Sequence, residues 1–207
     1  MDTSSRTNQT RLLGAITIVG AVLMVLQFVW LGWVEGSPNL AISTVPRSLL
    51  LVVASLCLMA GPIGLRSVRA WSGVLGIVGM ALTLTGMLLW IVAAFYFIAD
   101  PDQEFNQLMS PAGGFAQSIG MILVSIAILR AKVLRSWQAF IPLLTRLFFV
   151  VQLDVQVAFR FSEGLPPLYY MQAILVLFWI PVGYIILAAQ GHRSSYANDT
   201  LAVRNSL

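Results

Sequence analysis

The chain has 207 residues, of which 58% are hydrophobic and 10% are charged, and its formal net charge is +4. A soluble domain carries about 25% charged residues, and a disordered chain combines high charge with low hydrophobicity, so this composition excludes both classes. The mean hydropathy of +0.87 is typical of an integral membrane protein. The basic residues are too few and too scattered for a nucleic-acid groove, so no nucleic-acid partner is expected.

Six stretches are apolar enough to cross a hydrocarbon core, which takes about 20 residues of helix. In chain order they cover residues 12–34, 48–65, 71–99, 113–129, 137–160 and 167–190. Because the connections between them are short, we predict an all-α fold, a polytopic membrane helix bundle with six transmembrane helices in a single domain (residues 1–207). Residues 191–207 form a polar tail.

The distribution of charge predicts the orientation of these spans. With the N-terminus in the cytoplasm, Arg47 is the only basic residue expected in an outer connection. The inner side then carries Arg6, Arg11, Arg66, Arg69, Arg130, Lys132, Arg135, Arg193 and Arg204, and the acidic residues of the connections lie outside. By the positive-inside rule both termini, including the tail, are cytoplasmic, which places the protein in the cytoplasmic membrane.

Tryptophans are expected to anchor the spans at the membrane surfaces, as they do in many membrane proteins. They are Trp30, Trp33, Trp71, Trp90, Trp137 and Trp179. Two of them end similar inner turns, 63–71 and 128–137, in which Leu-Arg and a small residue precede a valine and the tryptophan. This similarity has two interpretations, an internal repeat or convergence of two short basic turns.

The stretch from Ala127 to Trp137 also resembles a phrase found in the DUF4386-like group of bacterial multi-spanning membrane proteins. In that group a helix ends in Leu-Arg-Ala and is followed by Val-Leu-Pro-x-Trp. The present chain has Arg135 where the phrase has proline, and the resemblance covers one hairpin. It implies a bacterial helical membrane fold and no particular activity.

The fifth predicted span, 137–160, is the one with several polar side chains in its interior, among them Arg146, Gln152, Asp154 and Gln156. An arginine or aspartate at the centre of a span costs about 2.5–3.5 kcal/mol, so neighbouring helices must shield this one. At about 100° per residue, an arc from about 20° to 140° measured from Asp154 is free of polar residues and predicts the lipid-facing side. That arc contains Leu147, Phe148, Val151, Val155, Ala158 and Phe159.

Arg146 and Asp154 are about 12 Å apart along the helix, too far for an easy direct ion pair, so each needs another partner. Candidate partners on other spans are Thr83, Thr85, Gln117, Ser118, Gln172 and Tyr184. Two interpretations remain open for the charged pair. The residues either fix the order of the helices or line a polar cavity for a solute.

Proline and glycine mark two further features of the spans. Pro181 interrupts the sixth span, and such a break either serves a transport site or is a passive kink. Gly73, Gly76 and Gly79 in the third span predict close packing against a neighbouring helix.

We expect no metal and no cofactor. His192 is the only histidine, which excludes sites built on several imidazoles, and Cys57 is the only cysteine, which excludes an internal disulfide. The acidic run that begins at Asp100 lacks the glycine and the final glutamate of a calcium loop.

The sequence contains no motif of a known hydrolase or intramembrane protease, and we expect no catalytic residue. The favoured function is binding, or help in moving, a small solute or lipid in a polar pocket lined by the fifth span. The expected ligand-binding residues are Arg146, Gln152, Asp154, Gln156 and Gln172. The first alternative is an accessory subunit of a larger membrane complex, and the second is an intramembrane enzyme that uses Asp154. Besides the bilayer and the ligand, the partners expected are further copies of the chain or such a complex.

Overall fold

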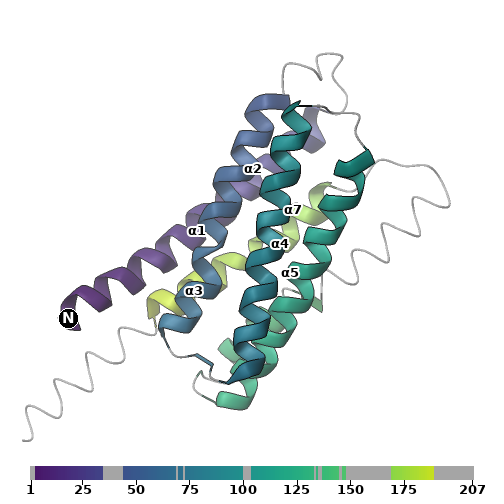
Figure 1. Cartoon of the computed structure of the whole chain (residues 1–207). Helices are drawn as coiled ribbons and strands as arrows, with labels where there is room; N and C mark the ends of the chain where they lie inside the picture. Colours follow the sequence, from purple (N-terminus) through teal and green to yellow (C-terminus); the bar gives the residue numbers. More distant parts are fainter. Residues whose placement is uncertain are drawn as a thin grey trace, which may run out of the picture.

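The computed structural model describes residues 3–34, 44–68, 70–71, 73–99, 104–132, 134, 137–144, 146–147 and 169–188. Within these ranges every regular element is a helix (Figure 1). The helices are α1 (Thr3–Val34), α2 (Thr44–Leu58), α3 (Ala60–Ser67), α4 (Val74–Ala99), α5 (Glu104–Ala131) and α7 (Tyr169–Leu177). Residues 137–144, 146–147 and 179–188 are also helical.

Four helical stretches are long and apolar enough to cross a membrane, which indicates a multi-pass membrane protein. They are Thr7–Trp30, Val45–Ser67, Val74–Ala99 and Pro111–Ala131, and they correspond to the first four predicted spans. Gln172–Ala188 is a shorter apolar helix within the predicted sixth span. Of the fifth span, only 137–144 and 146–147 lie in the described part of the chain, so the count of six stays a prediction.

Several helix boundaries differ from the expectation. Helix α1 begins at Thr3 and α2 at Thr44, before the expected starts at residues 12 and 48. The connection expected up to Ala112 is helical from Glu104 onward, so α5 begins before the apolar stretch does. A helix needs no apolar side chains outside the hydrocarbon layer, because its backbone hydrogen bonds are made internally. The expected third span begins at Trp71, whereas α4 begins at Val74 and Trp71 lies in the turn before it.

Helices α4 and α5 pack side by side along their lengths through glycines on both partners (Figure 1). A Cβ atom on Gly79 would lie 2.6 Å from Gly120 O, and one on Gly86 would lie 2.5 Å from Gly113 O. The backbones therefore touch directly, as in membrane helix pairs with small residues at the interface. The predicted close packing of Gly79 is confirmed. Gly73 instead lies in the turn before α4, with a φ of +88° that favours glycine.

Helix α1 contacts α2, α3 and α7. It crosses the last described helix at another glycine pair, since a Cβ on Gly14 would lie 2.9 Å from Gly183 O. Farther along α1 towards its C-terminus, a Cβ on Gly20 would lie 2.7 Å from the Cβ of Cys57 in α2. These two approaches place α1 against both the α2–α3 stretch and the C-terminal helix.

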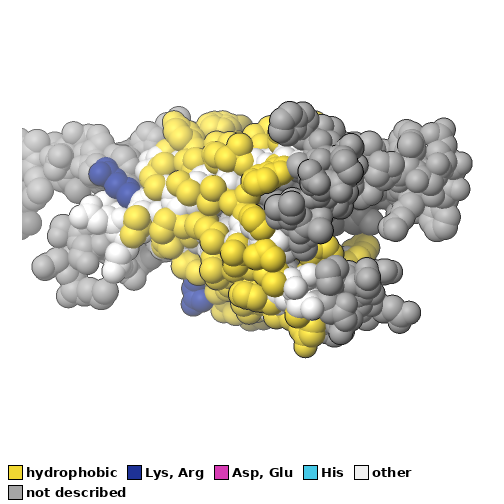
Figure 2. Space-filling model, turned by 90° about the horizontal axis from the view of Figure 1, so that it is seen from above, with side chains coloured by type: hydrophobic (Ala, Val, Ile, Leu, Met, Phe, Trp, Pro, Cys, Tyr) yellow, Lys and Arg dark blue, Asp and Glu magenta, His cyan; other side chains and the backbone are white. Residues whose placement is uncertain are grey.

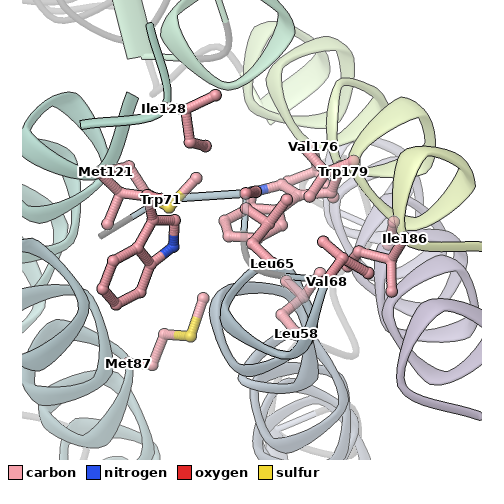
Figure 3. Packing of buried hydrophobic residues seen from close by; sticks show 14 of the residues in the cluster. Leu58, Leu65, Val68, Trp71, Met87, Met121, Ile128, Val176, Trp179 and Ile186 are labelled. Carbon is pink, nitrogen blue, oxygen red and sulfur yellow. The ribbon is translucent and has the colours of Figure 1, made fainter. Parts of the chain in front are cut away.

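The interior between these helices is filled by a cluster of buried apolar side chains from α1, α2, α3, α4, α5 and the C-terminal helix (Figure 3). Large hydrophobic side chains also cover the outer faces, for example Val19 and Leu26 on α1 and Ile77 and Phe95 on α4. Figure 2 shows that apolar side chains dominate the described surface in that view. In water such a surface would promote aggregation, whereas in a bilayer it is the ordinary lipid-facing surface.

The tryptophans differ in burial, while their depth in the membrane stays a prediction. Trp30 and Trp137 are exposed, but Trp71 is only 6% exposed and packs against Gly76. Trp179 is only 1% exposed. The two turns with similar sequences therefore use their tryptophans differently, because Trp71 is buried while Trp137 is 54% exposed.

Candidate functional site

Arg146 is the charged side chain inside the described bundle, with only 1% of its surface exposed. Its neighbours follow the helical pattern expected for the fifth span. Leu144 and Leu147 are exposed, whereas Ala139 and Pro142 are buried on the side of Arg146. The prediction that Arg146 faces protein rather than lipid is confirmed.

Trp179 contacts this arginine. The guanidinium carbon of Arg146 lies 5.4 Å from the centroid of the Trp179 ring. A cation within about 6 Å of an indole ring is attracted by the negative face of the ring, and this attraction strengthens where water is excluded. Because both side chains are almost completely buried, the pair replaces part of the hydration that the arginine loses.

Gly61 in α3 also packs closely against Trp179. A Cβ atom on Gly61 would lie 2.7 Å from Cζ3 of Trp179 and 3.3 Å from Cγ2 of Thr17 in α1. Position 61 therefore accommodates the indole ring only as glycine. Figure 3 shows Trp179 beside Val176 on the C-terminal helix and near Leu65 of α3. Arg146 thus joins a junction of α1, α3 and the C-terminal helix.

Two proline-containing helices meet at this junction. Pro62 follows Gly61 and has no N–H to donate to Leu58 O, and the helix is interrupted at Met59, between α2 and α3. Pro181 similarly leaves Leu177 O without its usual donor, and α7 ends at Leu177. Phe178 forms a turn there, with its N–H donating to Leu175 O at 3.3 Å.

The interruption predicted from Pro181 is confirmed, while the interruption beside Pro62 was not anticipated. The signal for the second one is the local sequence Gly61-Pro62-Ile63-Gly64 inside an apolar stretch. Glycine and proline together are unusual in the interior of a helix and often mark a kink.

The described part of the chain tests only one of the other predicted binding residues. Gln152, Asp154 and Gln156 lie outside the described residues. Gln172 is half-buried in α7, about 10 Å along the helix from Trp179, and no contact in the described part joins it to Arg146. The structure therefore brings together Arg146, Trp179 and Gly61, of which only Arg146 was predicted as a binding residue.

The candidate partners on the third, fourth and sixth spans divide into three groups. The hydroxyls of Thr83 and Ser118 donate to Gly79 O at 2.8 Å and Gly114 O at 2.7 Å, within their own helices. Thr85 and Tyr184 are exposed. Gln117 is buried, and its Oε1 has no hydrogen-bond partner among the described residues.

Gln117 lies at about the depth of the Trp179 junction. The α2–α3 stretch runs antiparallel to α4, with Arg47 over Phe97 at one end and Trp71 against Gly76 at the other. This register places Gly61 level with the part of α4 that includes Gly86, and a Cβ atom on Gly86 would lie 2.5 Å from the backbone nitrogen of Gln117. Gln117 and Gly61 therefore lie at a similar depth in the bundle.

The packing of Gly61 on Trp179 makes a testable prediction. Gly61→Ala should lower the melting temperature in detergent, because the added methyl meets a buried ring that also contacts Arg146. The expected cost is about 1–3 kcal/mol. Trp179→Phe removes the ring atoms nearest to Gly61, so the double variant should lose less stability than the sum of the single variants. Strict additivity in thermal melts would contradict the described contact.

Comparisons of the chain with protein-family models, with curated proteins and with solved structures give no match. The resemblance of the 127–137 turn to the DUF4386-like group thus stays a prediction.

Proposed function

We propose that the chain is a non-catalytic protein of a bacterial cytoplasmic membrane that binds a small anionic solute or lipid at a buried polar site around Arg146. In this proposal six helices span the membrane and both termini are cytoplasmic. Four long apolar helices and the basic inner connections support this topology. Reporter fusions at the two ends test it, and a terminus that reports from the outer side would contradict it.

The observation that carries the proposed site is the burial of Arg146 against Trp179 where two proline-containing helices meet. An ionised side chain inside a membrane is expensive, and where it occurs it marks a substrate or ion site by default. Interrupted helices near the middle of the membrane are also a recurrent feature of solute sites in transporters. The two features coincide here at one junction.

The chemistry of the arginine indicates the class of ligand. A guanidinium presents five N–H donors in a planar fork that matches a carboxylate or a phosphate. The contact with Trp179 stabilises the positive charge through the face of the ring. The site therefore favours a small anion, or an anionic headgroup, over a cation or a neutral apolar compound.

Thermal shift measurements on the purified full chain test this proposal. The probes are acetate, inorganic phosphate and phosphatidylglycerol, each titrated in a neutral detergent. At least one of them should raise the melting temperature of the unmodified protein, since a ligand that binds the folded state stabilises it in proportion to RT ln(1 + [L]/Kd). Arg146→Gln should abolish this response, and Arg146→Lys should weaken it because the fork is lost.

Arg47→Gln is the matched control, because Arg47 also lies over an aromatic ring, that of Phe97 at 5.5 Å, yet is only half-buried. The control variant should respond to the anion as the unmodified protein does. An equal response of Arg146→Gln, or no response to any probe, would contradict the proposed site. Co-purification with another membrane protein at fixed stoichiometry would favour the accessory-subunit alternative instead.

A further inference from the structure

Arg146 and the ring that contacts it are both enclosed inside the described bundle. Each side chain is only 1% exposed, and the guanidinium carbon lies 5.4 Å from the centroid of the Trp179 ring. An anion that binds Arg146 can therefore reach the guanidinium only after a part of this enclosure moves. The elements around the arginine differ in how easily they can do so.

The break in the last described helix lies directly before Trp179. Pro181 has no N–H to donate to Leu177 O, and the N–H of Phe178 donates at 3.3 Å to Leu175 O, three residues back rather than the regular four. Hydrogen bonds of this shorter span have poorer geometry than those of an α-helix. Leu177 is 45% exposed, so a shift at this point displaces lipid rather than packed protein. The chain bends here at a lower cost than inside a regular helix.

The other proline break, between α2 and α3, is held more firmly. The N–H of Met59 donates to Ser55 O at 3.0 Å, and this acceptor is the regular one four residues back. Pro62 is buried, whereas Pro181 is half-buried. Movement at the α2–α3 break would therefore disturb packed side chains to a greater extent.

The part of the C-terminal helix beyond Trp179 is also fixed in place. A Cβ atom on Gly183 would lie 2.6 Å from Cγ1 of Ile18 and 2.8 Å from Gly14 O in α1. At that approach the backbones of the two helices are in contact. Trp179 thus lies between a tightly packed part of its helix and a part that has lost a helical hydrogen bond, so bending at the break would turn its ring.

We infer that Trp179 is a gate over Arg146, and that the break from Phe178 to Pro181 is the hinge on which the gate opens to admit an anion. This inference rests on the proposed binding of an anion at Arg146. In the closed state the ring contacts the guanidinium and excludes water, and in the open state the guanidinium is available to the ligand. Gly61 provides the space for the closed ring, because a Cβ atom there would lie 2.7 Å from it.

Chemical modification of Arg146 measures the opening of the gate without any ligand. Phenylglyoxal reacts with guanidinium groups that it can reach, and mass spectrometry of the purified full chain in a neutral detergent follows the reaction at residue 146. Pro181→Ala returns an N–H that can donate to Leu177 O, so it should close the break. The net contribution of one such hydrogen bond corresponds to a slowing of the modification by about fivefold.

Pro111→Ala is the matched control, because Pro111 also lies inside a helix but is exposed on α5. It should leave the modification rate of Arg146 unchanged. Arg47, which is half-buried over Phe97, provides the internal reference in every sample and should react at the same rate in all variants. A variant that unfolds is recognised by a faster reaction at Arg47.

Trp179→Leu is a second variant, and it decides the question if Pro181→Ala does not fold. It removes the ring over the guanidinium, so the modification of Arg146 should become faster while that of Arg47 stays the same. Equal rates at Arg146 in the unmodified protein, Pro181→Ala and Pro111→Ala would overturn the inference. So would a rate in Trp179→Leu that matches the unmodified protein.

The same experiment separates the gate from the proposed function. If Pro181→Ala slows the modification of Arg146 but no anion raises the melting temperature of the unmodified protein, the opening is confirmed and the binding of an anion is contradicted. If an anion raises the melting temperature but the modification rates of the variants are equal, the binding site is supported and the gate is wrong.

Discussion

Gly120→Val should abolish the close pairing of α4 and α5 and reduce the folded yield severely. A Cβ atom at position 120 would lie 2.5 Å from Thr83 Oγ1 and 2.6 Å from Gly79 O, and the backbone nitrogen of Thr83 is nearer still. Two of these atoms belong to the backbone of a helix that cannot shift locally. Overpacking a well-packed interior costs about 1–3 kcal/mol, and we expect the upper end of this range or more.

Ala81→Val provides the control for this prediction, because Ala81 is on α4 but exposed on its outer face. The measurement is the monodisperse fraction in size-exclusion chromatography, together with the melting temperature of what remains folded. Gly120→Ala should give an intermediate loss. If Gly120→Val melts at the temperature of Ala81→Val, the two helices do not cross as closely as described.

The fold of the first four spans could be predicted because apolar length alone decides whether a helix crosses a membrane. The pairing of α4 with α5 could not. Gly79 was expected to pack closely, but its partner Gly120 lies on another helix, and a sequence pattern within one span does not name its neighbour. Helix pairing depends on which faces meet across the bundle, which is a long-range property of the chain.

The burial of Arg146 was predictable because one side of its helix carries only apolar residues in the sequence, and Arg146 lies outside that side. Its contact with Trp179 was not, because tryptophan in a membrane protein is most often assigned to the interface. The helical spacing of the residues after Trp179 would have indicated that this tryptophan faces the interior. Trp179, Val182 and Ile186 follow one another at spacings of three and four, and all three are buried.

The two proline-containing helices also leave backbone carbonyl oxygens without helical donors near the junction. Gly61 allows the indole ring to reach α3, and Pro62 immediately beyond it leaves Leu58 O without its helical donor. The same loss occurs at Leu177 O before Trp179. Two backbone acceptors that lack their helical donors thus lie close along the chain to residues of the Arg146–Trp179–Gly61 junction.

Arg146→Glu should be the most destructive single charge substitution in the described bundle. It replaces a buried cation over the Trp179 ring with an anion that the negative face of the ring repels. Breaking a buried charge interaction costs about 3–5 kcal/mol, so little folded protein should accumulate. Folded yield and melting temperature in detergent provide the measurement.

Arg47→Glu is the matched substitution, and it separates the effect of burial from that of the aromatic contact. Both arginines lie over a ring at nearly equal distance, 5.4 Å for Arg146 and 5.5 Å for Arg47, but Arg47 is half-buried near the start of α2. At a site of that exposure the contact contributes about 0.5–1 kcal/mol, and solvent remains available to the new carboxylate. A large loss at position 146 with a small one at position 47 therefore assigns the cost to desolvation. Equal losses would mean that the ring contact dominates, and Arg146 would then be a packing residue rather than the charge of a binding site.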